Sequence, residues 1–272
     1  MFNYDRAKEL YVQGKSLRAI AQELNIDRKK LSKKLKEDGL IIRDPNKNSI
    51  SKSKRVYSLN ESVFSNIDSE EKAYWLGFLY ADGYINRDRN SIELSLAECD
   101  LEHLEKFKSF TECENEIKYR PNQKAYRLVI YSQKIVDDLI KLGCTQAKSL
   151  TLQFPTESQV PSHLIQHFMR GYFDGDGSVS SIKANKGNSY QLRFSILGTS
   201  DFLNDYESIL LNVLNREKGN KRQSEGQAFS VSYNGNKQAK NFFNFLYNNA
   251  TIYLERKYAK FTAVLGASRK DS

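Results

Sequence analysis

Cysteine is scarce in this sequence, and long apolar runs are missing from it. The three cysteines, Cys99, Cys113 and Cys144, show no C-x-x-C spacing, so they predict free thiols in a reducing compartment rather than a disulfide scaffold. The sequence also has no signal peptide and no apolar run of about 18 residues, which argues against secretion and membrane insertion. We therefore expect a cytoplasmic protein of bacterial or phage type, or a nuclear or organellar one in a eukaryote.

Histidine is equally rare, and the histidines present do not suggest a catalytic site. The three histidines are His103, His163 and His167. His163 and His167 stand four residues apart in an expected helix and could form half of a zinc site. Because no further ligand accompanies them, packing or capping is the favoured interpretation.

Positive charge is in excess and is unevenly distributed. The 272 residues carry 42 Lys+Arg against 33 Asp+Glu, a net charge of +9. Residues 1–57 alone hold 15 basic and seven acidic residues, and thus +8 of that excess. A chain this basic favours a polyanionic partner, most often nucleic acid.

Residues 3–39 predict three short helices. The first runs from Tyr4 to Gln13, Ser16 can cap the second, and Asp27 can cap the third, which runs from Arg28 to Glu37. The third helix exposes a set of basic side chains: Arg28, Lys29, Lys30, Lys33, Lys34 and Lys36. Helix, tight turn and basic helix is the helix-turn-helix pattern, so we predict DNA binding, although a merely solvated helix face remains an alternative.

The domain boundaries follow from composition. We assign residues 1–42 to the helix-turn-helix domain and residues 43–57, rich in serine, asparagine and basic residues, to a linker. This linker is either a simple tether or a basic segment that tracks phosphates.

Two segments of the remaining chain are near copies of each other. Trp75–Gly83 and Met169–Gly177 both read apolar-x-Gly-apolar-apolar-x-small-Asp-Gly, and their aspartates lie 94 residues apart. A helix that stops in Asp-Gly places a carboxylate at its end. Two such helices packed side by side would bring together two carboxylates, which bind divalent metal.

The segments that follow each motif also repeat. The first copy predicts a helix capped by Asp68, strands in 85–97, a helix at 100–110, strands in 116–131 and a helix at 134–142. The second predicts a helix opened by Pro161, strands at 177–182 and 192–197, a helix at 201–214, strands at 217–222 and 229–233, and a helix at 236–247. The prediction is an α+β fold with two αββαββα halves, residues 58–154 and 155–272.

The motif glycines suggest how the two helices meet. Gly77 and Gly171 fall in mid-helix, where glycine is costly unless it permits close backbone approach. We expect Gly83 and Gly177 to adopt left-handed helix caps, and Arg170 to face away from the helix interface. Two ordinary buried helices with capped ends are the alternative, which the duplication disfavours.

Over residues 69–265 this constellation resembles the LAGLIDADG homing endonuclease family. The resemblance implies two pseudo-symmetric halves joined at the motif helices, with their sheets forming a saddle over the DNA major groove. It implies metal binding at the eighth motif position, Asp82 and Asp176, with the carbonyls of Ala81 and Gly175 as further ligands. Asp174, at the sixth position, is secondary, because the family does not need that position for the metal.

The implied chemistry is phosphodiester hydrolysis. Two carboxylates that share hard cations, Mg²⁺ or Mn²⁺, can activate water and stabilise the leaving oxygen. The family also places a basic residue in each half beside the scissile phosphate. The candidates here are Lys148 and Lys257, although each could equally be a surface charge.

The expected strands supply candidate DNA contacts, of which strand alternation places about half on the DNA side. The basic candidates are Lys118, Arg120, Lys124, Arg127, Lys183, Lys186, Arg193, Arg216, Lys218, Lys221 and Arg222. Candidates for contacts to base edges are Asn86, Asn90, Gln123, Asn185 and Gln191.

The sequence thus predicts a monomeric, site-specific double-strand DNA endonuclease of the kind that mobilises introns or inteins. Two diverged halves predict an asymmetric target of roughly 20 base pairs or more, at about one turn of about 10 base pairs per half. The alternatives are a transcription regulator or an RNA splicing maturase on the same fold, and a two-domain DNA-binding protein whose motifs only form an interface.

Overall fold

The structure is a computed structural model, and it falls into two compact units, Met1–Val56 and Tyr57–Ser272. The residues that it describes are 4–13, 15–40, 42, 58–146, 151–183, 190–216, 220–223 and 228–267. No helix among these residues is both long enough and apolar enough to span a bilayer.

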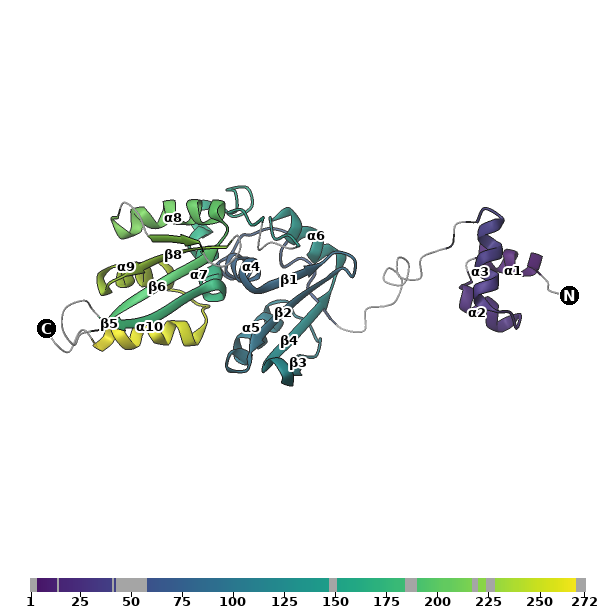
Figure 1. The fold of residues 1–272 in the computed structure, drawn as a ribbon, viewed down its shortest axis with the longest axis horizontal. Helices are drawn as coiled ribbons and strands as arrows, with labels where there is room; N and C mark the ends of the chain where they lie inside the picture. The colour runs from purple at the N-terminus through teal and green to yellow at the C-terminus, as the bar shows by residue number, and fades with distance from the viewer. Residues whose placement is uncertain are drawn as a thin grey trace. The chain divides into compact units, whose positions relative to one another are not determined.

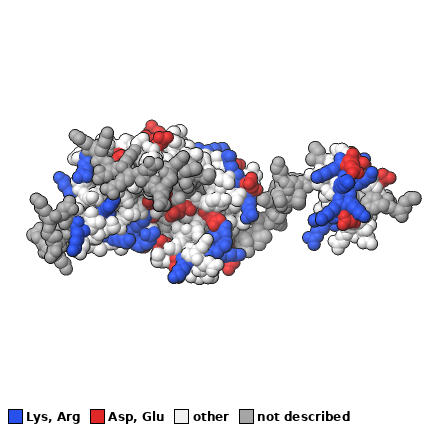
Figure 2. Space-filling view, viewed as in Figure 1, with Lys and Arg blue, Asp and Glu red and all other residues white. Residues whose placement is uncertain are grey.

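Within its described residues, the N-terminal unit has three helices around a small apolar core. They are α1 (Tyr4–Val12), α2 (Leu17–Glu23) and α3 (Arg28–Glu37). Both predicted caps are confirmed, because Ser16 Oγ accepts from the Ala19 amide at 3.1 Å and Asp27 Oδ1 accepts from the Lys30 amide at 2.8 Å. The six basic side chains of α3 are all exposed, and Figure 2 shows how much of this unit's visible surface they and other cations occupy.

The larger unit contains two four-stranded antiparallel sheets with the same strand order. The first half comprises α4 (Glu70–Asp82), β1 (Gly83–Asn86), β2 (Ser91–Ala97), α5 (Leu101–Phe110), β3 (Lys118–Arg120), β4 (Ala125–Tyr131) and α6 (Gln133–Lys141). The second comprises α7 (Ile165–Asp176), β5 (Gly177–Lys183), β6 (Tyr190–Gly198), α8 (Ser200–Leu214), β7 (Asn220–Gln223), β8 (Phe229–Asn234), α9 (Asn236–Tyr247) and α10 (Glu255–Ala267). The sheet orders β1-β2-β4-β3 and β5-β6-β8-β7 confirm the duplicated α+β architecture.

Helices cover one face of each sheet and leave the other face open. Helices α5 and α6 pack on the first sheet, while α8, α9 and α10 pack on the second. The motif helices α4 and α7 lie side by side between the two sheets (Figure 1). A single apolar core therefore runs through both halves of this unit.

Helix α10 is an addition to the predicted repeat. It follows the last expected element of the second half and packs on α9 and β5. Tyr258, Phe261 and Leu265 recur along it at helical spacing and join the core, and Phe261 is fully buried. Lys257 therefore lies in the first turn of a helix rather than in a tail.

Two expectations about helix ends are wrong. The residue that caps α4 is Ser69, whose Oγ accepts from the Lys72 amide at 3.4 Å, whereas Asp68 pairs with the Lys72 ammonium at 2.8 Å. Gly83 and Gly177 have φ values of −72° and −80°, so neither forms a left-handed cap. Each instead begins a strand.

Steric crowding explains why these positions hold glycine. A Cβ at Gly83 would lie 2.7 Å from the carbonyl oxygen of Leu79, and a Cβ at Gly177 would lie 2.4 Å from that of Phe173. Real Cβ atoms do not come so close to backbone oxygens. The chain therefore turns from helix into strand within a space that only glycine fits.

Candidate active site and nucleic-acid interface

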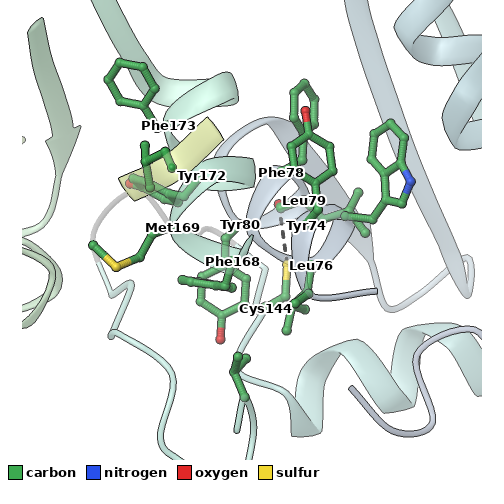
Figure 3. Close-up of a cluster of buried hydrophobic side chains, with 14 of the residues drawn as sticks. Tyr74, Leu76, Phe78, Leu79, Tyr80, Cys144, Phe168, Met169, Tyr172 and Phe173 are labelled. Atoms are coloured by element: carbon green, nitrogen blue, oxygen red, sulfur yellow. Dashed lines mark hydrogen bonds between the residues drawn. The ribbon is translucent and has the colours of Figure 1, made fainter. Parts of the chain in front are cut away.

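The motif helices meet backbone to backbone at two glycines. A Cβ at Gly77 would lie 2.0 Å from the carbonyl oxygen of Phe168, and a Cβ at Gly171 would lie 1.9 Å from that of Tyr74. The predicted role of both glycines is therefore confirmed. Figure 3 shows the apolar side chains that surround this contact, with Phe78 on one helix and Tyr172 on the other.

These contacts make the two helices parallel. Tyr74 lies against Gly171 and Ala81 lies against Gly175, so residue numbers rise together along both helices. Both helices consequently end at the same place. A Cβ at Gly175 would lie 3.2 Å from Asp82 Oδ2, so the Asp82 carboxylate reaches the residue beside Asp176. The pairing of the motif aspartates thus follows from the glycine contacts.

The two aspartates differ in their surroundings. Asp82 is exposed, and Asp176 is partly buried beside a pocket of about 170 Å³ that Tyr80, Tyr172 and Thr199 help to line. Burial, and next the Asp176 carboxylate, raises the pKa of the Tyr172 hydroxyl, which donates to the Leu197 carbonyl at 2.8 Å. Tyr172 therefore stays neutral and forms one wall of the site.

Lys257 is a cation close to these aspartates. Its side chain is only 3% exposed, and its ammonium donates to the carbonyl oxygens of Phe173 at 2.7 Å and Gly175 at 2.9 Å. Burial lowers the pKa of Lys257 to about 8, against the attraction of Asp174, Asp82 and Asp176. The predicted residue thus lies within electrostatic range of both motif aspartates. The other candidate, Lys148, lies outside the described residues.

The donor set fits a hard cation that brings some of its own ligands. No cluster of three or more His, Cys, Asp or Glu side chains suited to a metal occurs within the described ranges. Two carboxylates suit Mg²⁺, which is usually held by one or two carboxylates together with waters and substrate phosphates. Of the two predicted backbone ligands, the Gly175 carbonyl already accepts from Lys257, which competes with metal binding.

Contrary to the expectation from the sequence, Arg170 does not face away from the helix interface. Its guanidinium is fully buried, pairs with Glu70 at 2.6 Å, and donates to the carbonyls of Ile252 at 2.9 Å and Leu246 at 2.8 Å. A buried charge is tolerated where such partners satisfy it. His167 Nδ1 lies 3.0 Å from the same guanidinium, so this histidine packs as expected and does not form part of a zinc pair.

The outer face of the first sheet carries three of the basic residues predicted to contact DNA. Strand register pairs Lys118 with Arg127, and Arg127 with Ser95, on the side away from the helices. Lys118, Arg120 and Arg127 line a hollow of about 350 Å³, and Glu93 forms an ion pair with Arg127. Lys124 is exposed at the β3–β4 turn.

The outer face of the second sheet carries several serine hydroxyls and one arginine. Register aligns Ser180 with Arg193, Arg193 with Asn234, and Ser178 with Ser195. Arg193 is therefore on the open face, whereas Lys183 lies on the opposite side of β5, in register with Tyr190.

In strand β7, Arg222 is in register with Ser230 and Lys221 with Val231. Asn185, Lys186 and Lys218 lie outside the described residues.

Known proteins share this sequence pattern and fold. Residues 164–246 match the family described as LAGLIDADG-like domain. A stretch of 129 residues, 46% of this chain, is 29% identical to the replication factor C small subunit of Methanocaldococcus jannaschii, but it spans 7% of that protein's length.

Two solved structures are similar to this chain at low sequence identity. The I-LtrWI LAGLIDADG homing endonuclease bound to target DNA has a TM-score of 0.50 and 17% identity, over 75% of this chain and 92% of that one. A mutant of I-SmaMI has a TM-score of 0.52 and 16% identity, over 73% of this chain and 92% of that one. Residues 164–246 thus form a LAGLIDADG-like domain, and the larger unit has the fold of LAGLIDADG homing endonucleases.

Proposed function

We propose that this chain is a site-specific, metal-dependent DNA endonuclease that cleaves both strands of a long asymmetric target. The observation that carries the proposal is the convergence of Asp82, Asp176 and Lys257 at the shared end of two parallel helices. A carboxylate pair beside a buried ammonium is suited to phosphodiester hydrolysis, which needs both a cation site and positive charge near the phosphate.

Each residue of the site has a distinct role in this proposal. Asp82 and Asp176 would hold Mg²⁺ or Mn²⁺, which supplies Lewis acidity and a more acidic bound water. Lys257 would stabilise negative charge on the phosphate at the end of α7, where its ammonium is fixed by two carbonyls. Lys148 would serve the first half in the same way.

The open faces of the two sheets would bind the DNA. Lys118, Arg120 and Arg127 give the first face a basic patch suited to phosphates and guanine, whereas serines and Arg193 give the second a face of short hydrogen-bonding groups. Because the two sheet faces differ in chemistry, they should recognise half-sites of different sequence. The target is then asymmetric, of roughly 20 base pairs or more, and one chain acts as a monomer.

The N-terminal unit would act as a helix-turn-helix that binds flanking DNA. Six exposed cations on α3 support this proposal, since they would contact phosphates along a groove. The unit would lengthen the footprint on one side of the cleaved site.

A cleavage selection tests the proposed function. Full-length protein is incubated with a library of randomised duplexes and Mg²⁺, with a chelator control, and the cut ends are sequenced. Cleavage at one asymmetric sequence in Mg²⁺ alone supports the proposal. Selective DNA binding without cleavage would indicate a transcription regulator, and stimulation of RNA splicing without DNA cleavage would indicate a maturase; both would overturn it.

A further inference from the structure

We propose that Asp174 is a positioning residue that holds Lys257 in place for cleavage. This inference rests on the proposed function and deepens it. Asp174 occupies the sixth motif position and is absent from the set of expected metal ligands. Its role follows from the groups that donate hydrogen bonds to its carboxylate.

The Asp174 carboxylate is buried and collects three donors. Tyr74 OH donates to Oδ2 at 2.8 Å, Tyr247 OH donates to Oδ1 at 2.6 Å, and the Leu254 amide donates to Oδ2 at 2.8 Å. Tyr74 belongs to α4, Tyr247 ends α9, and Leu254 immediately precedes α10. One carboxylate thus joins the first half, the last repeat helix and the start of α10.

The Leu254 bond extends directly to Lys257. The carbonyl oxygen of Leu254 accepts from the Lys257 amide at 3.0 Å and from the Tyr258 amide at 3.1 Å, which forms the first turn of α10. The Lys257 ammonium in turn donates to Phe173 and Gly175, the two neighbours of Asp174 in sequence. The Asp174 side chain therefore holds the start of α10, and the backbone carbonyls of Phe173 and Gly175 hold the Lys257 ammonium.

Two further contacts stabilise the connection between α9 and α10. Glu70 accepts from the Thr251 amide at 2.8 Å, and Arg170 donates to the Ile252 carbonyl. Polar side chains from both motif helices thus contribute to where α10 begins. These side chains bind the backbone of the connection to α10, so in this proposal they act through Lys257.

The first half anchors the end of its last repeat helix with an uncharged side chain. Tyr80 occupies the sixth motif position there, and its hydroxyl donates to the Leu142 carbonyl just after α6. In both halves the sixth position therefore anchors the end of the last repeat helix. Only the second half does so with a charged group, so loss of that charge should affect one half-site and hence one DNA strand.

A double-mutant cycle tests the proposal. Asp174→Asn keeps the shape of the side chain and removes its charge, and Lys257→Met removes the ammonium. Under single turnover with saturating target, Asp174→Asn should slow cleavage of one strand by about tenfold or more, because small misplacement of a catalytic group is costly. Nicked DNA should accumulate, on the same strand as with Lys257→Met, while target affinity is unchanged.

The double-mutant cycle distinguishes a positioning role of Asp174 from a general loss of structure. In the Lys257→Met background, Asp174→Asn should alter the rate by less than about twofold, because the residue that it positions is gone. Additive effects, equal loss on both strands, or loss of affinity in step with rate would overturn the proposal. Thr262→Val is the matched control, since that hydroxyl bonds only carbonyls of α10 itself, and it should leave both rates unchanged.

A second measurement does not require cleavage. Lysine acylation of the free protein, read by mass spectrometry, should show Lys257 protected in the native chain. In Asp174→Asn its reactivity should rise towards that of the exposed Lys260 on the same helix. Unaltered protection would overturn the proposal whatever the activity assay shows, whereas a native chain that never cuts DNA would count against the proposed function alone.

Tyr247→Phe provides a milder variant should Asp174→Asn fail to fold. It removes one donor to the carboxylate and leaves the Leu254 bond in place. Its smaller effect should fall on the same strand and should vanish in the Lys257→Met background. An effect on both strands would again contradict the assignment.

Discussion

Arg170 of α7 and Glu70 of α4 join the two halves through an ion pair of 2.6 Å whose guanidinium is completely buried. The same guanidinium also donates to the Leu246 carbonyl near the end of α9 and to the Ile252 carbonyl in the connection to α10. It therefore fixes both the helix pair and the C-terminal connection.

We predict that Arg170→Met lowers the free energy of unfolding by about 3 kcal/mol, near the lower end expected for breaking a buried pair, because Glu70 is partly exposed. Urea unfolding of the larger unit measures this change. Lys106→Gln, which disrupts the more exposed pairs with Glu102 and Glu255, is the control and should cost less than about 1 kcal/mol. Equal losses would show that burial of the Arg170 pair has little importance.

A second prediction concerns the glycine contact. Gly77→Ala or Gly171→Ala forces the facing backbones apart and should lower the free energy of unfolding by about 3 kcal/mol, the upper end of typical overpacking costs. Gly198→Ala is a matched control, because the three atoms nearest to its Cβ would all be side-chain atoms, the closest at 3.1 Å. Thermal unfolding of all three variants decides whether backbone contact is what constrains these positions.

The third prediction addresses the carboxylates. Asp82→Asn or Asp176→Asn should abolish cleavage in Mg²⁺ and leave target affinity within about tenfold, because the charge that holds the cation is halved while the sheets are unaltered. Asp137→Asn, on an exposed position of α6, serves as the control. Cleavage at the native rate by either motif variant would disprove the assignment.

The fourth prediction is that the buried Lys257 makes the free energy of unfolding depend on pH. Burial lowers its folded pKa to about 8, from the 10.5 that a lysine ordinarily shows. Between these values the unfolded chain binds more protons, so this lysine destabilises the fold fully below pH 8 and less as the pH rises towards 10.5. The unfolding free energy of the native protein, relative to Lys257→Met, should therefore increase over that window. A flat or falling difference, measured without metal or DNA, would contradict the buried cation.

The fifth prediction concerns the N-terminal unit. Removal of residues 1–57 deletes +8 of the +9 net charge, so DNA affinity should fall and its dependence on salt should weaken. Cleavage should persist at low salt, because Asp82, Asp176 and Lys257 all remain. A salt titration of binding for the intact and truncated chains measures both effects, and superimposable curves would leave the N-terminal unit without a DNA-binding role.

Local sequence signals predicted much of this architecture. The caps at Ser16 and Asp27 need only side chains three residues from their amides, so they are readable from the sequence. The meeting of α4 and α7 was also predictable, because glycine in mid-helix costs stability unless a facing backbone comes close. The pairing of Asp82 with Asp176 then followed from helix geometry.

Long-range polar contacts were not predictable from one sequence. Arg170 lies 100 residues from Glu70, and Asp174 lies 80 from Leu254, so no local pattern reveals either pair. The expectation that Arg170, as a charged residue, faces away from the helix interface was therefore wrong. Helix α10, in contrast, was predictable, because the apolar residues Tyr258, Phe261 and Leu265 recur at helical spacing.

The helix pair also determines how freely the two halves could be exchanged between proteins. The atoms nearest to Gly77 and Gly171 on the facing helix are backbone atoms, so a partner helix of similar course with glycine at the matching position would accept these contacts. The bonds from Glu70 to Arg170 and from Tyr74 to Asp174 are particular to this pair. A chimera that grafts a foreign first half onto this second half should therefore assemble only if it supplies a carboxylate and a phenol at those two places.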